Sequence, residues 1–158
     1  PVVRSARACR TLGARAARRA GSGGGGRIVN RADYERYLAC FNARDYEGVL
    51  GFWAPQFEAS FAGVVLRNGA ELRRFYAFLH SYLDERIHVE DFIGDERLVA
   101  LRAQVRIEGK RELTRETLVA AGFGGLHPIA SGQVIEMQQL ILYRLEGGRF
   151  KQVYCGLL

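Results

Sequence analysis

The first part of the chain repeats apolar side chains at helical spacing. After Asn30, whose amide suits a helix N-cap, the residues Tyr34, Tyr37, Leu38 and Phe41 fall three or four positions apart. This pattern predicts a first helix that ends near position 43 and turns its apolar face towards a core.

Two further helices are expected from the same spacing. A short one should run from Tyr46 to Trp53, and Pro55 should end it. The most amphipathic stretch runs from Ala70 to Leu83, with its apolar residues on one side. Both precede the long segments that alternate like strands, so helices are expected mainly in the N-terminal half.

From position 88 onwards the apolar residues follow the period of a strand rather than that of a helix. Residues 98–108 alternate strictly, so Leu101 is expected to face the core and Arg102 the outside. Segment 112–123 fits either a strand or a short helical insert. The other expected strands are 57–61, 88–93, 134–145 and 150–157. Three helices combined with mostly antiparallel strands predict an α+β fold rather than a parallel doubly wound sheet.

The excess of positive charge lies outside this patterned region. The chain carries 23 Lys and Arg against 17 Asp and Glu, a formal net charge of +6. Six of the arginines fall in residues 1–26, which contain no acidic residue, so residues 27–158 hold 17 basic and 17 acidic side chains. A domain without excess positive charge has little attraction for phosphate backbones, and we expect no nucleic-acid partner.

Residues 1–26 differ from the rest in composition, being rich in Arg, Ala, Gly and Ser and ending in a glycine run. We expect a disordered Arg/Gly-rich tail or leader there, followed by one folded domain over residues 27–158. An Arg-rich, acid-free segment is also typical of an organelle transit peptide, which is the alternative for residues 1–20.

The three cysteines, Cys9, Cys40 and Cys155, form no recognisable disulfide framework, which favours a reducing, cytoplasmic setting. No apolar run approaches the ~20 residues that span a membrane, so no membrane partner is expected. No His, Cys and Asp spacing resembles a metal site, and the glycine clusters lack the context of a phosphate loop. We therefore expect neither a metal nor a cofactor.

Several short motifs resemble one superfamily in their order and spacing. Residues 37–54 (YLACFNARDYEGVLGFWA) resemble the opening of the nuclear-transport-factor-2-like (NTF2-like) superfamily, which includes ketosteroid isomerases and SnoaL-like polyketide cyclases. Residues 68–76 (NGAELRRFY) resemble the start of its third helix. Residues 128–134 (PIASGQV) and 143–150 (YRLEGGRF) resemble the last two strands of SnoaL-like members. The likeness covers nearly all of residues 30–156.

The resemblance implies an NTF2-like cone, in which three N-terminal helices pack on a strongly curved, mostly antiparallel sheet. It also implies an apolar pocket inside the cone that holds a small apolar ligand. The residues expected to contact this ligand are Phe41, Trp53, Phe57, Phe61, Phe75, Leu79, Leu101, Gln138, Leu140 and Cys155.

Tyr37 falls where ketosteroid isomerases place the tyrosine that donates a hydrogen bond to the developing oxyanion, although a packed aromatic would also fit. The two isomerase carboxyls fall on Phe61, or on Ser60 with one gap, and on Leu140. None of these side chains can take a proton from carbon, so the resemblance implies that the isomerase mechanism is lost.

The segment before the last strand offers other polar candidates. Glu136 shares one face of the expected strand with Gln138 and Leu140. If Leu140 faces the pocket, as the resemblance implies, Gln138 faces it too and Glu136 lies near its rim. Glu136 is therefore a candidate catalytic carboxyl.

Histidine and cysteine supply the remaining candidates. His127, in a loop, is a candidate general base beside a carboxylate, as are His80 and His88. Cys155 is expected on the inner face of the last strand as a small buried residue. It would act as a nucleophile only with a base beside it.

Two functions fit these features. The first is a SnoaL-like enzyme, such as an isomerase, cyclase, hydratase or epoxide hydrolase, acting on a small apolar molecule. The alternative is a non-catalytic ligand-binding or dimerisation module. An ionisable group facing the cavity would favour catalysis. We also expect a homodimer through the outer sheet face, where Arg102, Gln104 and Arg106 would lie beside Gln139, Ile141 and Tyr143.

Overall fold

The computed structural model describes residues 27–28 and 30–158; residues 1–26, expected to form a tail or leader, lie outside the described residues. The helices are α2 (Arg31–Asn42), α3 (Tyr46–Leu50), α4 (Gly69–Tyr82) and α5 (Arg115–Ala121). The strands are β1 (Trp53–Phe61), β2 (Val64–Asn68), β3 (Leu83–Gly94), β4 (Leu98–Gly109), β5 (Val134–Glu146) and β6 (Arg149–Leu157). This mixture of elements confirms the predicted α+β class.

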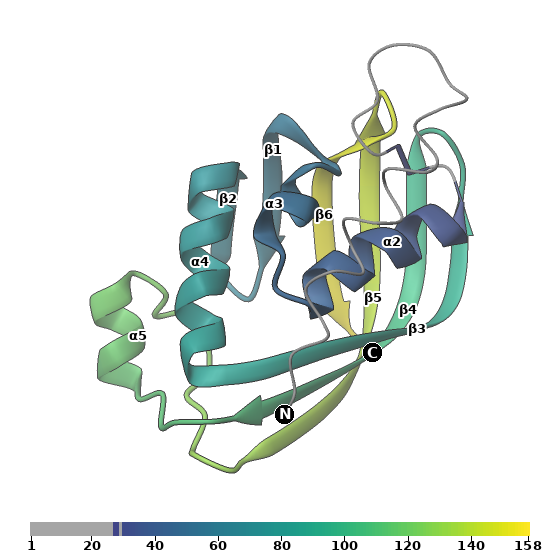
Figure 1. Ribbon diagram of the computed structural model, residues 1–158. Coiled ribbons are helices and arrows are strands. Elements are labelled where there is room, and N and C mark those ends of the chain that lie inside the picture. The colour runs from purple at the N-terminus through teal and green to yellow at the C-terminus, as the bar shows by residue number, and fades with distance from the viewer. Residues whose placement is uncertain (1–26, 29) are drawn as a thin grey trace, which may run out of the picture.

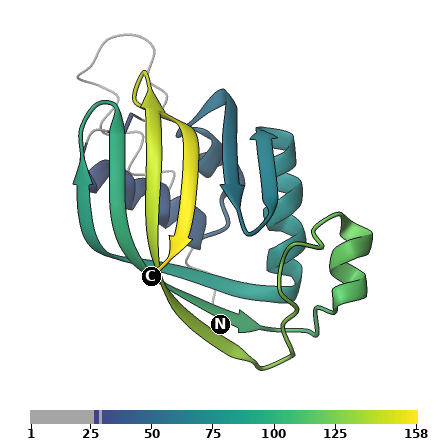
Figure 2. The same cartoon turned by 180° about the vertical axis from the view of Figure 1, so that it is seen from behind.

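The six strands form one curved sheet in the order β2-β1-β6-β5-β4-β3. Strands β1 and β6 pair in parallel, and the other neighbours are antiparallel. Helices α2, α3 and α4 lie against one side of the sheet (Figure 1). Seen from behind, no helix of the described residues covers the opposite side of the sheet (Figure 2). Within the described residues, the sheet therefore has a concave face under the helices and an outer face that no helix covers.

Capping side chains mark the starts of α2 and α4. The Asn30 side chain accepts a hydrogen bond from the Asp33 backbone amide at the start of α2. At the start of α4, Asn68 accepts from the amide of Glu71, whose carboxylate in turn accepts from the Arg67 backbone amide. Both helix starts were predicted to within one residue, because the capping signals are local.

The region between α3 and α4 differs from the prediction. Helix α3 ends at Leu50, and Pro55 lies inside β1, close to an irregularity in the pairing of this strand. The five-residue strand β2 was not predicted, because turn signals flank it on both sides. The turn before it uses positive φ angles at Ala62 and Gly63, which suits a two-residue hairpin.

Strand β4 follows the predicted alternation. Leu101 is buried under the helices, whereas Arg102 points outwards and donates a hydrogen bond to Asp91. The ambiguous segment 112–123 contains α5, which Thr114 caps and Gly122 ends in the left-handed conformation. The buried residues of β4, Val99, Leu101, Ala103 and Val105, contribute an apolar surface to the concave face.

Candidate functional site

A cavity of about 540 Å³ lies between the concave face of the sheet and helices α2 and α4. Its lining comes from α2, α4, all strands except β2, the turn between β1 and β2 and the segments on either side of α5, and most of it is apolar. Eight residues predicted for the site line this cavity: Tyr37, Phe41, Trp53, Phe61, Phe75, Leu79, His127 and Cys155. Side chains far apart in the sequence thus meet around one cavity.

Two of the predicted ligand contacts belong to the packed core instead. Phe57 is buried, and its ring lies 4.4 Å from that of Trp53, but it does not line the cavity. Leu101 is also buried and pairs with Ile141 of β5. Alternation places a residue on the inner face, but packing among neighbours decides whether it reaches the cavity.

The predicted orientation of β5 is wrong. Ile135, Met137, Gln139, Ile141 and Tyr143 line the cavity. Their neighbours in the sequence, including the predicted site residues Glu136, Gln138 and Leu140, lie on the outer face.

The physical reason for this orientation is the distribution of charge and apolar surface along β5. Glu136 lies beside Arg106 of β4, with 3.6 Å between its carboxylate and the guanidinium, so facing outwards keeps it solvated and paired. Gln138 donates a hydrogen bond to Glu90 on the same outer surface. Leu140, placed inside by the resemblance alone, is 50 % exposed. Of the two predicted positions for isomerase carboxyls, only Phe61 therefore faces the cavity.

Three tyrosines form a polar cluster at the cavity wall, where Tyr37 and Tyr143 line the cavity and Tyr34 is buried without reaching it. The hydroxyls of Tyr34 and Tyr143 lie 3.1 Å apart and share a hydrogen bond. Tyr37 packs against both rings. Burial raises the pKa of Tyr37 well above its usual range, Tyr34 adds to the rise, and polar contacts with Trp53 and Tyr143 oppose it. The three residues, called the tyrosine cluster below, therefore remain neutral hydrogen-bonding groups at physiological pH.

Cys155 lines the cavity from β6 as a protonated thiol. Burial raises its pKa to about 12, and the carboxylate of Glu85 contributes further to this rise. Only the thiolate is a strong nucleophile, so this environment suppresses nucleophilic chemistry at Cys155. The expectation of a small buried residue fits this position better than a nucleophile does.

Glu85 of β3 is the functional candidate that the sequence analysis missed. Its side chain is 17 % exposed, and it is the only Asp or Glu among the described residues that line the cavity. Residues 83–87 belong to a stretch that was not predicted as strand, so no alternation argument covered this position. In the structure β3 begins directly after α4, so Glu85 is a strand residue whose side chain points inwards.

The histidines occupy different environments. His127 lines the cavity from the loop before β5 and is exposed to solvent. His80, on α4, is buried behind the cavity wall, 3.9 Å from the Glu85 carboxylate. His88 is exposed. Among residues 27–28 and 30–158, no group of three or more His, Cys, Asp or Glu is arranged to hold a metal ion.

The helices described here are all too short or too polar to span a membrane. A comparison with curated proteins finds no match. A comparison with solved structures finds many proteins of similar fold.

Three solved structures illustrate this likeness. The first is an NTF2-like protein of unknown function from Burkholderia pseudomallei, with 16 % identity, a TM-score of 0.59 and coverage of 79 % of this chain and 87 % of that one. The second is a proposed polyketide cyclase from Silicibacter sp. TM1040, with 19 % identity, a TM-score of 0.62 and coverage of 79 % and 85 %. The third is an LEH-like epoxide hydrolase from M. tuberculosis, with 10 % identity, a TM-score of 0.58 and coverage of 79 % of both chains.

At such low identities these structures establish the fold alone. The match to a family model is more specific, because the SnoaL-like domain model covers residues 34–153, from the first turn of α2 to the middle of β6. This stretch contains most of the residues that line the cavity. The chain therefore belongs to the SnoaL-like domain family.

Proposed function

We propose that this domain binds a small, largely apolar molecule inside the cone and acts on it as a cofactor-independent enzyme of the isomerase, cyclase, hydratase or epoxide hydrolase type. The observation that carries the proposal is the cavity of about 540 Å³, whose apolar lining is interrupted by a few polar groups. Sites for small molecules commonly combine an apolar wall with a few groups that orient the ligand.

The polar groups limit what the ligand can be. Tyr37 and Tyr143 of the tyrosine cluster line the cavity as neutral phenols, which can donate hydrogen bonds to a carbonyl, hydroxyl or epoxide oxygen. No Arg or Lys is among the described lining residues, so a phosphate or a multiply charged acid would bury its charge without a partner. A neutral cyclic ketone or a terpenoid with one or two oxygens fits best.

Trp53 provides a direct test of binding. It is the single tryptophan of the chain and lines the cavity. Titration with 1-tetralone, a neutral aromatic ketone, should quench its fluorescence saturably, and calorimetry with limonene oxide should detect binding of a ligand that absorbs no visible light. If neither ligand binds, and no other oxygenated apolar ligand does, the non-catalytic interaction module becomes the better explanation.

Neighbouring positions of β5 supply a matched control. Met137→Arg places a long charged side chain in the cavity, whereas Gln138→Arg places the same side chain on the outer face. The first variant should lose binding and the second should keep it. Circular dichroism of both variants would show that the fold survives. Equal affinities would mean that the ligand binds elsewhere.

We also propose that the outer sheet face forms a homodimer. The corrected orientation of β5 puts Glu136, Gln138 and Leu140 on this face instead of Gln139, Ile141 and Tyr143. Leu140 is 50 % exposed and Tyr154 of β6 is 43 % exposed, so an apolar centre lies among charged neighbours, as in many interfaces. Sedimentation at micromolar concentration should give a dimer, and Leu140→Arg should give a monomer.

A further inference from the structure

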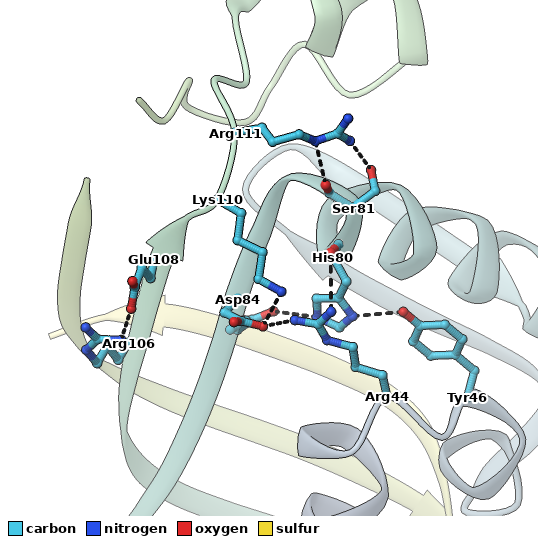
Figure 3. A network of polar contacts seen from close by, with 10 residues as sticks. Arg44, Tyr46, His80, Ser81, Asp84, Arg106, Glu108, Lys110 and Arg111 are labelled. Atoms are coloured by element: carbon cyan, nitrogen blue, oxygen red, sulfur yellow. Dashed lines mark hydrogen bonds and ion pairs between the residues drawn. The ribbon is translucent and has the colours of Figure 1, made fainter. Parts of the chain in front are cut away.

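Glu85 stands apart from the other acidic residues of β3. Asp84 pairs with Arg44 and Lys110, and Glu90 and Asp91 both pair with Arg102 on the outer face. Figure 3 shows Arg44 and Lys110 converging on Asp84. Among the described residues, Glu85 has no Arg or Lys partner and lines an apolar cavity instead. Pairing with Arg or Lys therefore does not explain a carboxylate in such surroundings.

His80 lies directly behind this carboxylate. Its side chain is 4 % exposed, and its Nε2 is 3.9 Å from Oε2 of Glu85. This nitrogen has no hydrogen-bond partner among the described residues. An unsatisfied polar atom in a buried side chain lowers stability, so its presence calls for an explanation.

The other nitrogen of His80 is held firmly. Nδ1 lies 2.9 Å from the hydroxyl of Tyr46, and Figure 3 shows this hydroxyl pointing at the imidazole ring. The ring also stacks on Tyr46 with an interplanar angle of 12° and on Tyr76 with one of 29°. Stacking on both tyrosines fixes the plane of the imidazole and the direction in which Nε2 points.

The hydrogen bond to Tyr46 selects a tautomer. If the phenol donates its proton to Nδ1, the imidazole proton resides on Nε2 and faces Glu85. A separation of 3.9 Å exceeds a hydrogen bond, but a rotation of the Glu85 side chain can close it. Contacts in active sites are often long without substrate and shorten when it binds. His80 would then hold one carboxylate oxygen of Glu85 and leave the other free for the cavity.

We propose that Glu85 is the catalytic base of this domain, that it removes a proton from carbon in a bound apolar substrate, and that His80 is the positioning residue that orients it. This inference rests on the proposed function, because it requires a substrate in the cavity. The C–H electron pair moves into the substrate as the proton passes to Glu85. The carboxylic acid then returns the proton to another carbon or releases it to water.

A simple carbon acid tests this chemistry. In 5-nitrobenzisoxazole, loss of the C3 proton forms a nitrile as the N–O bond breaks, and the released 2-cyano-4-nitrophenolate absorbs visible light. Binding is measured first, by quenching of Trp53, and turnover afterwards. Absence of binding would count against the proposed function. Binding without turnover above the buffer rate would overturn the inference about Glu85.

Substitutions then assign the base. Glu85→Gln should lower kcat at least ~100-fold, the usual cost of removing a general base, and formate should restore activity saturably to Glu85→Ala. Glu90→Gln, on the outer face of the same strand, is the matched control and should leave the rate unchanged. Equal rates in Glu85→Gln and the unmodified protein would overturn the assignment.

The positioning role of His80 has its own readout. His80→Gln can still present an N–H donor to Glu85, whereas His80→Leu cannot, so the first should keep clearly more of kcat than the second. Tyr46→Phe removes the group that selects the tautomer, and it should lower kcat about tenfold with KM unchanged. Equal losses in both His80 variants, or a change in KM alone, would show a merely structural role.

Discussion

The cavity has two polar regions that differ in whether their buried polar groups have hydrogen-bond partners. In the tyrosine cluster, Tyr34 and Tyr143 satisfy each other, and burial keeps their phenols neutral. Beside Glu85, a carboxylate faces an apolar space and His80 Nε2 lacks a partner. The first region stabilises the fold, whereas the second sacrifices stability, as functional sites often do. The contrast predicts that stability and chemistry can be changed separately.

The largest expected effect concerns the ring of Tyr34. This side chain is completely buried and packs against the rings of Tyr37, Phe92, Tyr143 and Phe150. Tyr34→Ala should lower the free energy of unfolding by about 3–5 kcal/mol, the range typical of large buried aromatic residues. Urea denaturation followed by circular dichroism measures it. A loss below 1 kcal/mol would mean that the cluster is not part of the stabilising core.

Alkaline pH should weaken the same region. Burial raises the pKa values of Tyr34, Tyr37, Tyr76 and Tyr143 above the usual tyrosine range, and that of Cys155 to about 12. The unfolded chain therefore releases these protons first, and stability should fall as pH rises above about 9–10. Each group contributes up to about 1.4 kcal/mol per pH unit.

Denaturation curves between pH 8 and pH 11 measure this slope. Removing two phenols with Tyr34→Phe and Tyr143→Phe together should make it shallower, whereas Glu85→Gln should change it little. Constant stability up to pH 11 would contradict the buried, neutral state of the cluster.

A smaller effect isolates the hydrogen bond within the cluster. Tyr34→Phe keeps the ring but removes one partner of the Tyr143 hydroxyl, so it should cost about 1 kcal/mol. The double variant with Tyr143→Phe should cost less than the sum of the two single changes, because each single change leaves one hydroxyl of the Tyr34–Tyr143 pair without the other and the double variant removes both. Strict additivity in denaturant unfolding would indicate that the two hydroxyls do not interact.

Glu85 should behave differently from the tyrosine cluster. Glu85→Gln removes a charge from an apolar wall without removing an Arg or Lys ion pair, so the free energy of unfolding should stay within about 1 kcal/mol or rise slightly. Thermal unfolding measured beside Tyr34→Phe makes the contrast direct. A loss of several kcal/mol would show that Glu85 has a structural rather than a chemical role.

The smallest expected effect uses Cys155 as a reporter of the charge on Glu85. The carboxylate helps to raise the pKa of this thiol, so Glu85→Gln should lower it and speed alkylation by iodoacetamide a few-fold. Mass spectrometry of the peptide containing Cys155 separates it from Cys9 and Cys40. An unchanged alkylation rate would mean that the charge of Glu85 does not affect the pKa of the Cys155 thiol.

Local signals explain why much of the fold was predictable. Caps at Asn30 and Asn68, the amphipathic residues of α4 and the strict alternation of β4 each depend on neighbours within a few positions. Strand β2 was missed because five residues between two turn signals carry too little pattern. The first half of β3 was missed because it follows α4 without an intervening turn.

The candidate site was predictable only in part. Tyr37, Phe41, Trp53, Phe61, Phe75 and Cys155 line the cavity as expected, whereas Phe57 does not. Strand β5 has apolar residues on both faces, so alternation alone did not determine which face points inwards, and the resemblance favoured the wrong one. In the structure, Glu136 pairs with Arg106 on the outer face, and this pairing shows which face of β5 points inwards.

The amino-acid sequence by itself determined the α+β class, the positions of most elements and an apolar interior rich in aromatic residues, because these depend on short-range periodicity and burial. Only the tertiary structure decided which polar groups meet inside the cone. His80 and Glu85 lie on either side of the direct junction between α4 and β3, and Tyr46 comes from α3, so no periodic pattern links the three. Their association depends on how the chain turns from α4 into β3 and on how α3 packs beside α4, because these two arrangements bring a carboxylate, an unsatisfied imidazole and a phenol together.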